Sequence, residues 1–220
     1  NKNNSDTTTI SFNQDVGPMM TSALGEVEKF LILRHGGFPG GHRVEISFEE
    51  QYSPKDGPSA AVACALMLNS LSDGVKLDTR FAVTGDMNSD GSVQAVGGID
   101  GKLRGAANKG CTHVAIPKQN EEVLTDLMVS GDWKTVAKVQ VLTIETFEQA
   151  QAIALYPEFR SAEINDAIEV FATVQEVLPR DGAERYLGNA QVHDRLRTVL
   201  DALPNHASAR LLLLAGTGGL

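Results

Sequence analysis

The sequence predicts an α/β domain, built as a mixed sheet with packed helices, followed by an all-helical C-terminal appendage. Hydrophobic residues make up 42% of the 220 residues and aromatic residues only 5%, so the core is mostly aliphatic, which suits helices packed on a sheet. Helical and strand-like patterns alternate as far as about residue 155, and beyond it only helical patterns remain. We therefore expect one domain over residues 9–155 and a helical extension over residues 156–220.

The expected elements follow the hydrophobic spacing and the placement of proline and glycine. Pro18 suits the first turn of a helix, and an Asn-Ser-Asp-Gly turn separates two short strands. The predicted strands cover residues 42–48, 80–86, 92–96, 112–116 and 138–144. The predicted helices cover residues 18–35, 58–72, 99–109, 120–129, 145–155, 157–178, 183–202 and 206–214. Residues 1–8 are polar and are expected to be disordered.

The helical extension has the character of an interaction or oligomerisation element. Its stretch PNHASARLLLL resembles one helix pair of a truncated tetratricopeptide repeat. A single partial copy does not predict a repeat array, which needs several periods. A helical adaptor function would therefore require further repeats beyond Leu220.

Charge and cysteine content exclude several classes of partner. The formal net charge is −9 and the isoelectric point is near 5.0, whereas nucleic acid and anionic membrane both call for a basic surface. We therefore expect no nucleic-acid partner and no membrane partner. Cys64 and Cys111 lie far apart without metal-ligand spacing, so we expect two free thiols, no metal site and no cofactor.

The ends of the chain leave the compartment open. The sequence begins at Asn1 rather than at a methionine, so we expect that an upstream segment has been removed. No apolar run approaches the ~20 residues that a helix needs to span a bilayer. We also expect the natural protein to continue past Leu220, because the run RLLLL over residues 210–214 ends abruptly.

A candidate nucleophile lies in the segment PKDGPSAA, residues 54–61. Ser59 follows a tight Gly-Pro turn and opens an apolar helix, so its hydroxyl is expected at the positive end of the helix dipole. Backbone N–H groups in such a place can stabilise an oxyanion. A serine near a helix start is more often a simple helix cap. From this segment alone, both interpretations stay open.

A serine nucleophile needs a general base, and Lys102 is a better candidate than any histidine. The histidines are His35, His42, His113, His193 and His206, and none lies in a recognised catalytic motif. Lys102 ends the segment GGIDGK and is expected in the first turns of a short helix. A lysine serves as a base only when it is neutral, and burial in a dry pocket favours the neutral form. A lone lysine is otherwise a solvated surface charge.

Several segments taken in order resemble the proteolytic domain of Lon proteases. They are the PKDGPSA segment, Thr84-Gly85 at a strand end, the VGGIDGK segment, and the HVAIP strand that follows Lys109-Gly110. The separation between Ser59 and Lys102 also matches the family spacing. The likeness covers residues 15–155, approximately, and the joint match of several motifs in order is far more specific than any one alone.

The resemblance implies a serine peptidase in which Ser59 is the nucleophile and Lys102 is the general base. It places Thr84 near the lysine, where the threonine hydroxyl would orient the lysine side chain by hydrogen bonding. Backbone amides over residues 56–59 would stabilise the oxyanion. Asp56 would either bond to the lysine or cap a helix, and the cap is the favoured interpretation.

The turn segment contributes two further supporting residues, Gly57 and Pro58. The sequence departs from the family pattern nearby: Ala61 stands where the family has glycine, which would crowd the backbone behind the nucleophile. Asp86 replaces a glutamate, and Asp100-Gly101 replaces Lys-Glu before the base. The chain also lacks GxxxxGK[ST], the phosphate-binding motif of an ATPase module.

Two functions compete on these grounds. The first is an ATP-independent serine endopeptidase that hydrolyses unfolded proteins or peptides through an acyl-enzyme. The second is a non-catalytic scaffold of the same fold whose helical tail recruits a partner. The presence of both Ser59 and Lys102 favours the enzyme, and the resemblance implies a homo-oligomer in the form of a hexameric ring.

The segment DMNSDG, residues 86–91, matches the opening of a calcium loop. A complete loop needs an acidic ligand at its twelfth position, which is Gly97 in this sequence. The flanking residues are also predicted as strands rather than helices. A turn between two strands is the simpler interpretation.

Overall fold

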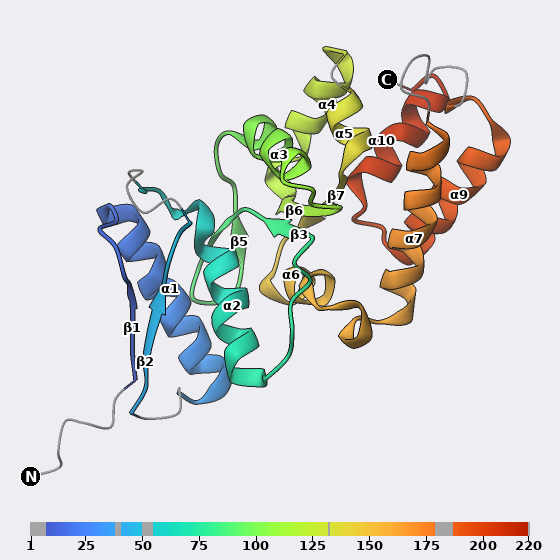
Figure 1. Cartoon of the computed structure of the whole chain (residues 1–220). Helices are drawn as coiled ribbons and strands as arrows, with labels where there is room; N and C mark the ends of the chain where they lie inside the picture. The colour runs from blue at the N-terminus through green and yellow to red at the C-terminus, as the bar shows by residue number, and fades with distance from the viewer. Residues whose placement is uncertain (1–7, 38–40, 50–54, 132, 179–186, 220) are drawn as a thin grey trace, which may run out of the picture.

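A three-stranded parallel sheet with the order β3-β6-β7 lies at the centre of the molecule (Figure 1). The computed structural model describes residues 8–37, 41–49, 55–131, 133–178 and 187–219. The central strands are β3 (Phe81–Val83), β6 (His113–Pro117) and β7 (Gln140–Ile144). Two smaller sheets are the parallel pair β1 (Thr9–Phe12) with β2 (Arg43–Ile46), and the antiparallel pair β4 (Asp86–Met87) with β5 (Val93–Gln94).

Helices pack around the central sheet, and further groups of helices lie at the two ends of the molecule. In Figure 1, α1 and α2 lie side by side next to β1 and β2, whereas α7, α9 and α10 form a group at the opposite end. The α-helices are α1 (Pro18–His35), α2 (Ala61–Asp73), α3 (Ile99–Asn108), α4 (Glu121–Val129), α5 (Trp133–Lys138), α6 (Phe147–Ala154), α7 (Ala162–Val177), α9 (Ala190–Ala202) and α10 (Ala207–Gly216). Short 3-10 turns are η1 (Pro58–Ala60), η2 (Lys118–Asn120) and η3 (Pro157–Phe159).

The central sheet is covered on both faces, as parallel sheets generally are. All five residues of β6 and all five of β7 are buried. Ala115, Leu142 and Ile144 pack into the cluster formed with α1, α2, α6 and α7. Val114 and Ile116 alternate with them and pack into the cluster formed with α3, α4 and α5. The two clusters together bury the sheet and fix the helices around it.

The helical extension packs directly against β7. Thr143 N–H donates to the Asn205 carbonyl (2.9 Å), and the Asn205 side-chain amide donates back to the Thr143 carbonyl (2.7 Å). Val141 N–H donates to Ser208 Oγ (2.9 Å). Ala207 and Leu211 join the hydrophobic cluster on the α3 side of the sheet. The extension thus covers the outer edge of β7 and shares the core of the preceding residues, while the boundary at residue 155 stays a prediction.

A buried ionic network joins Arg160, which follows η3, to Asp78, which precedes β3. Arg160 Nη2 lies 3.1 Å from Asp78 Oδ2, and both side chains are only 2% exposed. The same nitrogen donates to the Leu155 carbonyl (2.7 Å) and to His113 Nε2 (3.3 Å). Because these charges are paired and hydrogen-bonded, the burial of Arg160 is tolerated, and removal of one partner would leave an uncompensated buried charge.

The predicted fold class is confirmed, and most predicted elements are found. The helix over residues 18–35 has the predicted bounds, and the strands and helices from residue 99 to residue 155 differ only at their ends. The strand β1 and the helix α5 were not predicted. The predicted disorder of residues 1–8 lies outside the described residues, except at Thr8.

Four predicted elements were wrong in detail. The helix over residues 58–72 begins as the 3-10 turn η1, and α2 starts only at Ala61. The strand over residues 80–86 splits into β3 and β4, because the chain turns at Gly85, whose N–H donates to the Ser59 carbonyl (3.0 Å). The helix over 157–178 breaks before Ser161, whose hydroxyl caps α7 by accepting the Ile164 N–H. The predicted helix 183–202 falls partly outside the described residues, and α9 starts after the cap Asn189.

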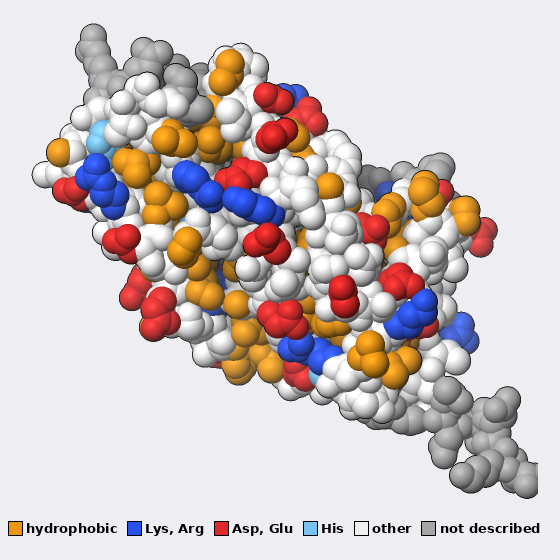
Figure 2. Space-filling view, turned by 180° about the vertical axis from the view of Figure 1, so that it is seen from behind, with side chains coloured by type: hydrophobic (Ala, Val, Ile, Leu, Met, Phe, Trp, Pro, Cys, Tyr) orange, Lys and Arg blue, Asp and Glu red, His pale blue; other side chains and the backbone are white. Residues whose placement is uncertain are grey.

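Charged and apolar side chains are interspersed on the molecular surface. Figure 2 shows acidic, basic and hydrophobic groups mixed over one face. Large exposed hydrophobic side chains occur on α1 and α2: Met19, Ile32, Leu33, Met67 and Leu71. Among the described residues, no helix is both long enough and apolar enough to cross a membrane.

Two buried histidines are held in their neutral forms. His206 Nδ1 accepts the Ala209 N–H (3.2 Å), which leaves Nε2 to donate to Gln140 Oε1 (3.2 Å). Burial lowers the pKa of His206 to about 3, and burial together with the Arg160 charge lowers the pKa of His113 to about 4. Between these values and the ordinary pKa of 6.5, the unfolded chain binds protons that the folded chain does not. Stability is therefore lost as the pH falls below about 6.5.

We expect His206→Asn to weaken this acid sensitivity. The parent should lose roughly 1–2 kcal/mol of unfolding free energy per buried histidine between about pH 7 and about pH 5, and the variant should lose about half as much as the parent. Asparagine still caps α10 but carries no titrating group. Urea unfolding at the two pH values measures the difference. Phe147→Leu, a large-to-small change in the core, serves as the control and should lower stability equally at both. An unchanged pH dependence in His206→Asn would contradict the assignment.

Candidate active site

Ser59 lies in a tight turn that precedes α2. Gly57 has φ +105° and ψ 147°, a backbone conformation that side-chain-bearing residues rarely adopt. Pro58 occupies the first position of η1, where its missing N–H costs nothing. Ser59 itself is half-buried in η1 rather than in the first turn of α2.

The backbone of Ser59 is held by the residues that follow β3. Its carbonyl accepts the Gly85 N–H (3.0 Å) and the Thr84 hydroxyl (3.2 Å). The Gly85 carbonyl in turn accepts the Val62 N–H (3.3 Å). A Cβ on Gly85 would lie 2.9 Å from Val93 Cγ1 and 3.1 Å from Val62 Cγ2, so this close approach needs glycine. Thr84-Gly85 thus fixes the turn that carries Ser59 against the carboxyl end of β3.

Asp56 caps a helix, as the sequence favoured, but the helix is α1 rather than its own. Its Oδ1 accepts the Met19 N–H (3.0 Å) and the Met20 N–H (3.2 Å), which are unpaired donors at the start of α1. Gly17 N–H donates to the Lys55 carbonyl (2.8 Å) beside this cap. The start of α1 therefore braces the turn that carries Ser59.

Lys102 lies in the first turn of α3 and is partly buried. Its N–H donates to the carbonyl of Gly98, the N-cap residue, which has φ +69°. Burial lowers the pKa of the Lys102 ammonium from its ordinary value. Among the described residues, no carboxylate forms an ion pair with Lys102. A lysine without an anionic partner and with a lowered pKa is suited to act as a base.

Asn120 holds the segment that leads into α3. Val96 N–H donates to Asn120 Oδ1 (3.0 Å), and Asn120 Nδ2 donates to the Val96 carbonyl (3.0 Å). The sequence prediction missed this residue, because it placed Asn120 inside a helix over residues 120–129, whereas its partner Val96 lies 24 residues earlier. Only its position after the HVAIP strand could have drawn attention to it.

The two candidate residues are thus anchored at one edge of the central sheet. β3 and β6 are parallel neighbours, with Val83 opposite Ala115, so their carboxyl ends lie together. Thr84-Gly85 follows β3 and holds the Ser59 turn, and Asn120 follows β6 and holds the approach to α3. In open α/β sheets, ligands bind outside the carboxyl ends of the strands.

Not all predicted interactions of the site are present in this arrangement. Within the described residues, no hydrogen bond joins Ser59 Oγ to Lys102 Nζ, and the Thr84 hydroxyl donates to Ser59 rather than bonding to the lysine. The Gly57 N–H donates to Asp56 Oδ1 (2.8 Å), and Pro58 has no N–H, so neither serves an oxyanion here. Pro54 lies outside the described residues.

Comparison with known proteins matches residues 36–156 to the family described as Lon protease (S16) C-terminal proteolytic domain. The match covers more than half of the chain and includes η1, α3 and the whole central sheet. The chain belongs to this family. The match ends within two residues of α6, at the start of the helical extension.

Relatives in the Lon family come from bacteria and archaea. The Lon protease of Clostridium beijerinckii is 38% identical over 95 residues, which is 43% of this chain and 11% of the relative. The Lon protease of Methanosarcina barkeri is 38% identical over 112 residues, 51% of this chain and 14% of the relative. Lon protease 2 of Bacillus subtilis is 30% identical over 129 residues, 58% of this chain and 22% of the relative. The chain thus spans only a small part of the relatives' length.

The departures from the Lon pattern are accommodated locally. Ala61 has φ −56° and ψ −48°, an ordinary helical conformation that does not require the family's glycine. Asp86 accepts the N–H of Met87 (2.8 Å), its own neighbour. Neither change touches Ser59 or Lys102 through an interaction among the described residues.

The calcium-like segment is a hairpin turn between β4 and β5. Asp90 Oδ1 accepts the Ser92 N–H (2.9 Å), and Gly91, with φ +85°, donates to the Asn88 carbonyl (2.9 Å). The Asp90 side chain thus bonds to the turn's own backbone, and the Asn88 side-chain amide donates to Ser92 Oγ (3.0 Å), which is typical of turn residues.

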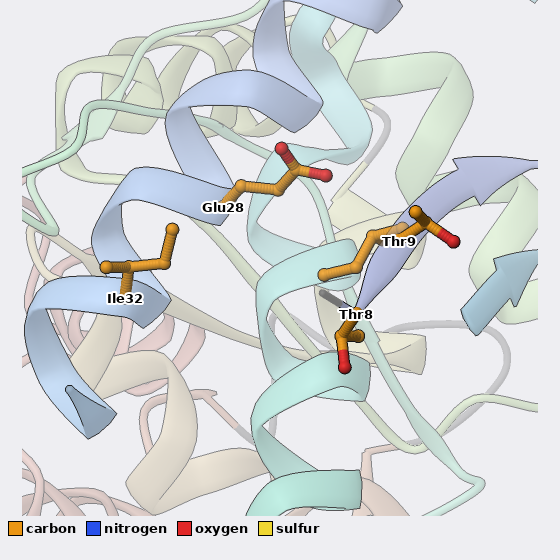
Figure 3. A pocket seen from close by; sticks show the side chains of 5 residues that line it. Thr8, Thr9, Glu28 and Ile32 are labelled. Carbon is orange, nitrogen blue, oxygen red and sulfur yellow. The ribbon is translucent and has the colours of Figure 1, made fainter. Parts of the chain in front are cut away.

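A separate hollow of about 290 Å³ lies between β1 and α1 (Figure 3). Its lining residues are Thr8, Thr9, Ile10, Glu28 and Ile32. None of these described lining residues belongs to the predicted site. Burial raises the pKa of the Glu28 carboxyl there.

We expect Gly17→Ala to destabilise the brace between α1 and the Ser59 turn. A Cβ on Gly17 would lie 2.1 Å from Asp56 Cγ, so the aspartate must leave the α1 cap. The expected loss is about 1–2 kcal/mol of unfolding free energy, which is the size of a lost cap. Gly25→Ala in the same helix is the control: nothing lies within 4 Å of a Cβ there, so it should stabilise by roughly 0.5–1 kcal/mol. Chemical denaturation compares the two, and equal effects would refute the brace.

Proposed function

We propose that this chain is a serine peptidase in which Ser59 is the nucleophile and Lys102 is the general base. The observation that carries the proposal is the common anchoring of both residues at the carboxyl edge of the β3-β6 pair. Membership of the Lon proteolytic family supports peptidase chemistry in general. The lowered pKa of Lys102 and its lack of an ion-pair partner among the described residues support the base assignment.

The proposed reaction is acyl transfer. Neutral Lys102 takes the proton of Ser59 as the serine oxygen attacks a peptide carbonyl, and the resulting ammonium protonates the leaving amine. Water then attacks the acyl-enzyme, with Lys102 again accepting a proton. This chemistry requires Ser59 Oγ and Lys102 Nζ to approach to about 2.6–3.2 Å, and catalytic hydrogen bonds often tighten only in the substrate complex.

The supporting residues act on the backbone of the nucleophile. Thr84 holds the Ser59 carbonyl, so its proposed role is to place the serine rather than to orient the lysine. Asp56, Gly57 and Pro58 shape the turn and connect it to α1. The Gly57 N–H of this turn is engaged by Asp56 Oδ1. If substrate binding shifts the turn and releases this N–H, it would stabilise the oxyanion.

The proposed substrates are unfolded proteins or peptides, cleaved without ATP. The chain contains no GxxxxGK[ST] motif that would power unfolding of a folded substrate. The relatives are named as proteases. Exposed apolar side chains on α1 and α2 are suited to contacts between copies in the hexameric ring that the resemblance implies.

The alternative function is a non-catalytic scaffold with the same fold. One observation favours it: Ser59 Oγ and Lys102 Nζ are not hydrogen-bonded to each other among the described contacts. A scaffold would bind its partner unchanged whether or not Ser59 is present. Peptide-bond hydrolysis separates the two functions.

We expect the chain to hydrolyse unfolded casein without ATP. Ser59→Ala and Lys102→Ala should each reduce hydrolysis by about 10³-fold or more, since residues that act as a unit fail together. Lys102→Arg should be equally inactive, because arginine does not deprotonate. Lys109→Ala, which removes a lysine that is 76% exposed, is the matched control and should keep parental activity. Folded parent without hydrolysis would move the assignment to the scaffold.

We also expect the rate of peptide hydrolysis to decrease as the pH is lowered. The active form of Lys102 is neutral, so kcat/KM should rise with pH up to the lysine's pKa, and burial moves that rise below the ordinary pKa of 10.5. A pH–rate profile with a fluorogenic peptide measures this rise of kcat/KM with pH. A profile that falls as the pH increases through this range would rule out a neutral lysine base.

A further inference from the structure

Asn120 occupies a helix-cap position but does not cap. It directly precedes α4, where an asparagine side chain ordinarily accepts an N–H of the first helical turn. In this structure the side chain makes no such bond. Both functional ends of its amide point instead to the backbone of Val96, 24 residues earlier in the chain. The residue therefore serves a segment other than its own helix.

The two hydrogen bonds satisfy both backbone polar groups of Val96, its N–H and its carbonyl. Val96 lies after β5 and outside any strand, so its N–H and carbonyl have no ladder partner. Backbone groups of a partly buried residue need a partner of this kind. Asn120 supplies a donor and an acceptor at 3.0 Å each, which fixes both the position and the direction of the chain at this point.

The fixed segment leads directly to the candidate base. Gly98, two residues after Val96, is the N-cap of α3, and its carbonyl accepts the Lys102 N–H (3.1 Å). Ile99 and Leu103 are buried in the cluster on this side of the sheet, which sets the rotation of α3. Any displacement of Val96 therefore moves the first turn of α3 and the lysine on it.

We propose that Asn120 is a positioning residue for the reaction of Ser59, acting on Lys102 through the Val96 backbone. The inference rests on the proposed Ser-Lys chemistry. Its physical basis is that a general base displaced by about 1 Å loses on the order of 10²-fold in rate. Asn120 links the carboxyl end of β6 to the lysine as Thr84-Gly85 links the carboxyl end of β3 to the serine.

The test compares Asn120→Ala with Asn189→Ala in the full chain. Asn189 is also an N-cap asparagine, but it caps its own helix α9 by accepting the Gln191 N–H (2.8 Å). Both variants lose hydrogen bonds of one asparagine and should lose stability, which urea unfolding measures. Only Asn120→Ala should lower kcat for a fluorogenic peptide, by about 10- to 100-fold with KM nearly unchanged. Its acid limb should also shift to higher pH as Lys102 becomes better solvated.

A direct titration of Lys102 provides a readout that does not need activity. The carbon signal next to its amine, assigned by its loss in Lys102→Ala, is followed by NMR against pH in the parent and both variants. Asn120→Ala should titrate at higher pH than the parent, and Asn189→Ala should titrate like the parent. Asn120→Asp keeps the bond from the Val96 N–H but places a second acceptor opposite the Val96 carbonyl. It replaces Asn120→Ala if the alanine variant does not fold. The pKa of Lys102 should then shift in the same direction.

Parental kcat and parental titration in the Asn120 variants would overturn the proposal. Equal effects of Asn189→Ala would overturn it as well, since stability alone would then explain the change. If the parent itself shows no hydrolysis that depends on Ser59, the peptidase function fails. In that case the NMR titration still decides whether Asn120 holds Lys102.

Discussion

The parallel pairing of β3 with β6 is the constraint on which the site depends. Because the two strands run in the same direction in register, the residues that leave them emerge at one edge of the sheet. Thr84-Gly85 and Asn120 are such residues, and each binds backbone groups of a segment that has no strand partner. The turn that carries Ser59 and the helix that carries Lys102 are therefore positioned by the sheet, although neither residue belongs to a strand.

Two kinds of interaction hold the elements of this molecule in place, namely hydrophobic burial and hydrogen bonds to irregular backbone. The two hydrophobic clusters cover the two faces of the sheet, and they consist mainly of aliphatic side chains from β6, β7 and the helices. The segments that carry Ser59 and Lys102 combine buried side chains, such as Ile99 and Leu103, with hydrogen bonds to backbone far away in the chain. Asp56 and Asn120 supply bonds of this kind, to distant backbone rather than to their own helices.

The sequence predicted the elements that have a strong period and missed those that depend on distant partners. Helix 18–35 and the buried strands around HVAIP follow directly from hydrophobic spacing. The strand β1 is only four residues long and mostly half-buried, so it lacks a clear alternation. The split of strand 80–86 could not be predicted, because it depends on Gly85 meeting the Ser59 carbonyl across the fold.

The candidate site shows the same division. Ser59, Lys102 and Thr84 were found from motifs, whereas the contacts of Asp56 and Asn120 join residues 36 and 24 positions apart. A local pattern identifies an asparagine or aspartate as a cap but cannot name the helix or segment that it serves. The Arg160–Asp78 pair, which buries two charges 82 positions apart in the chain, gave no local signal for the same reason.

The hydrogen bonds of Asn205 and Ser208 to β7 have a consequence for folding during synthesis. β7 is synthesised some sixty residues before the segment that covers its outer edge. During that interval the nascent sheet presents an open ladder of peptide groups, which is the kind of surface that chaperones shield and that neighbouring nascent chains can join. The segment that carries Asn205 and Ser208 can thus close this edge of the sheet only after β7 itself has been synthesised.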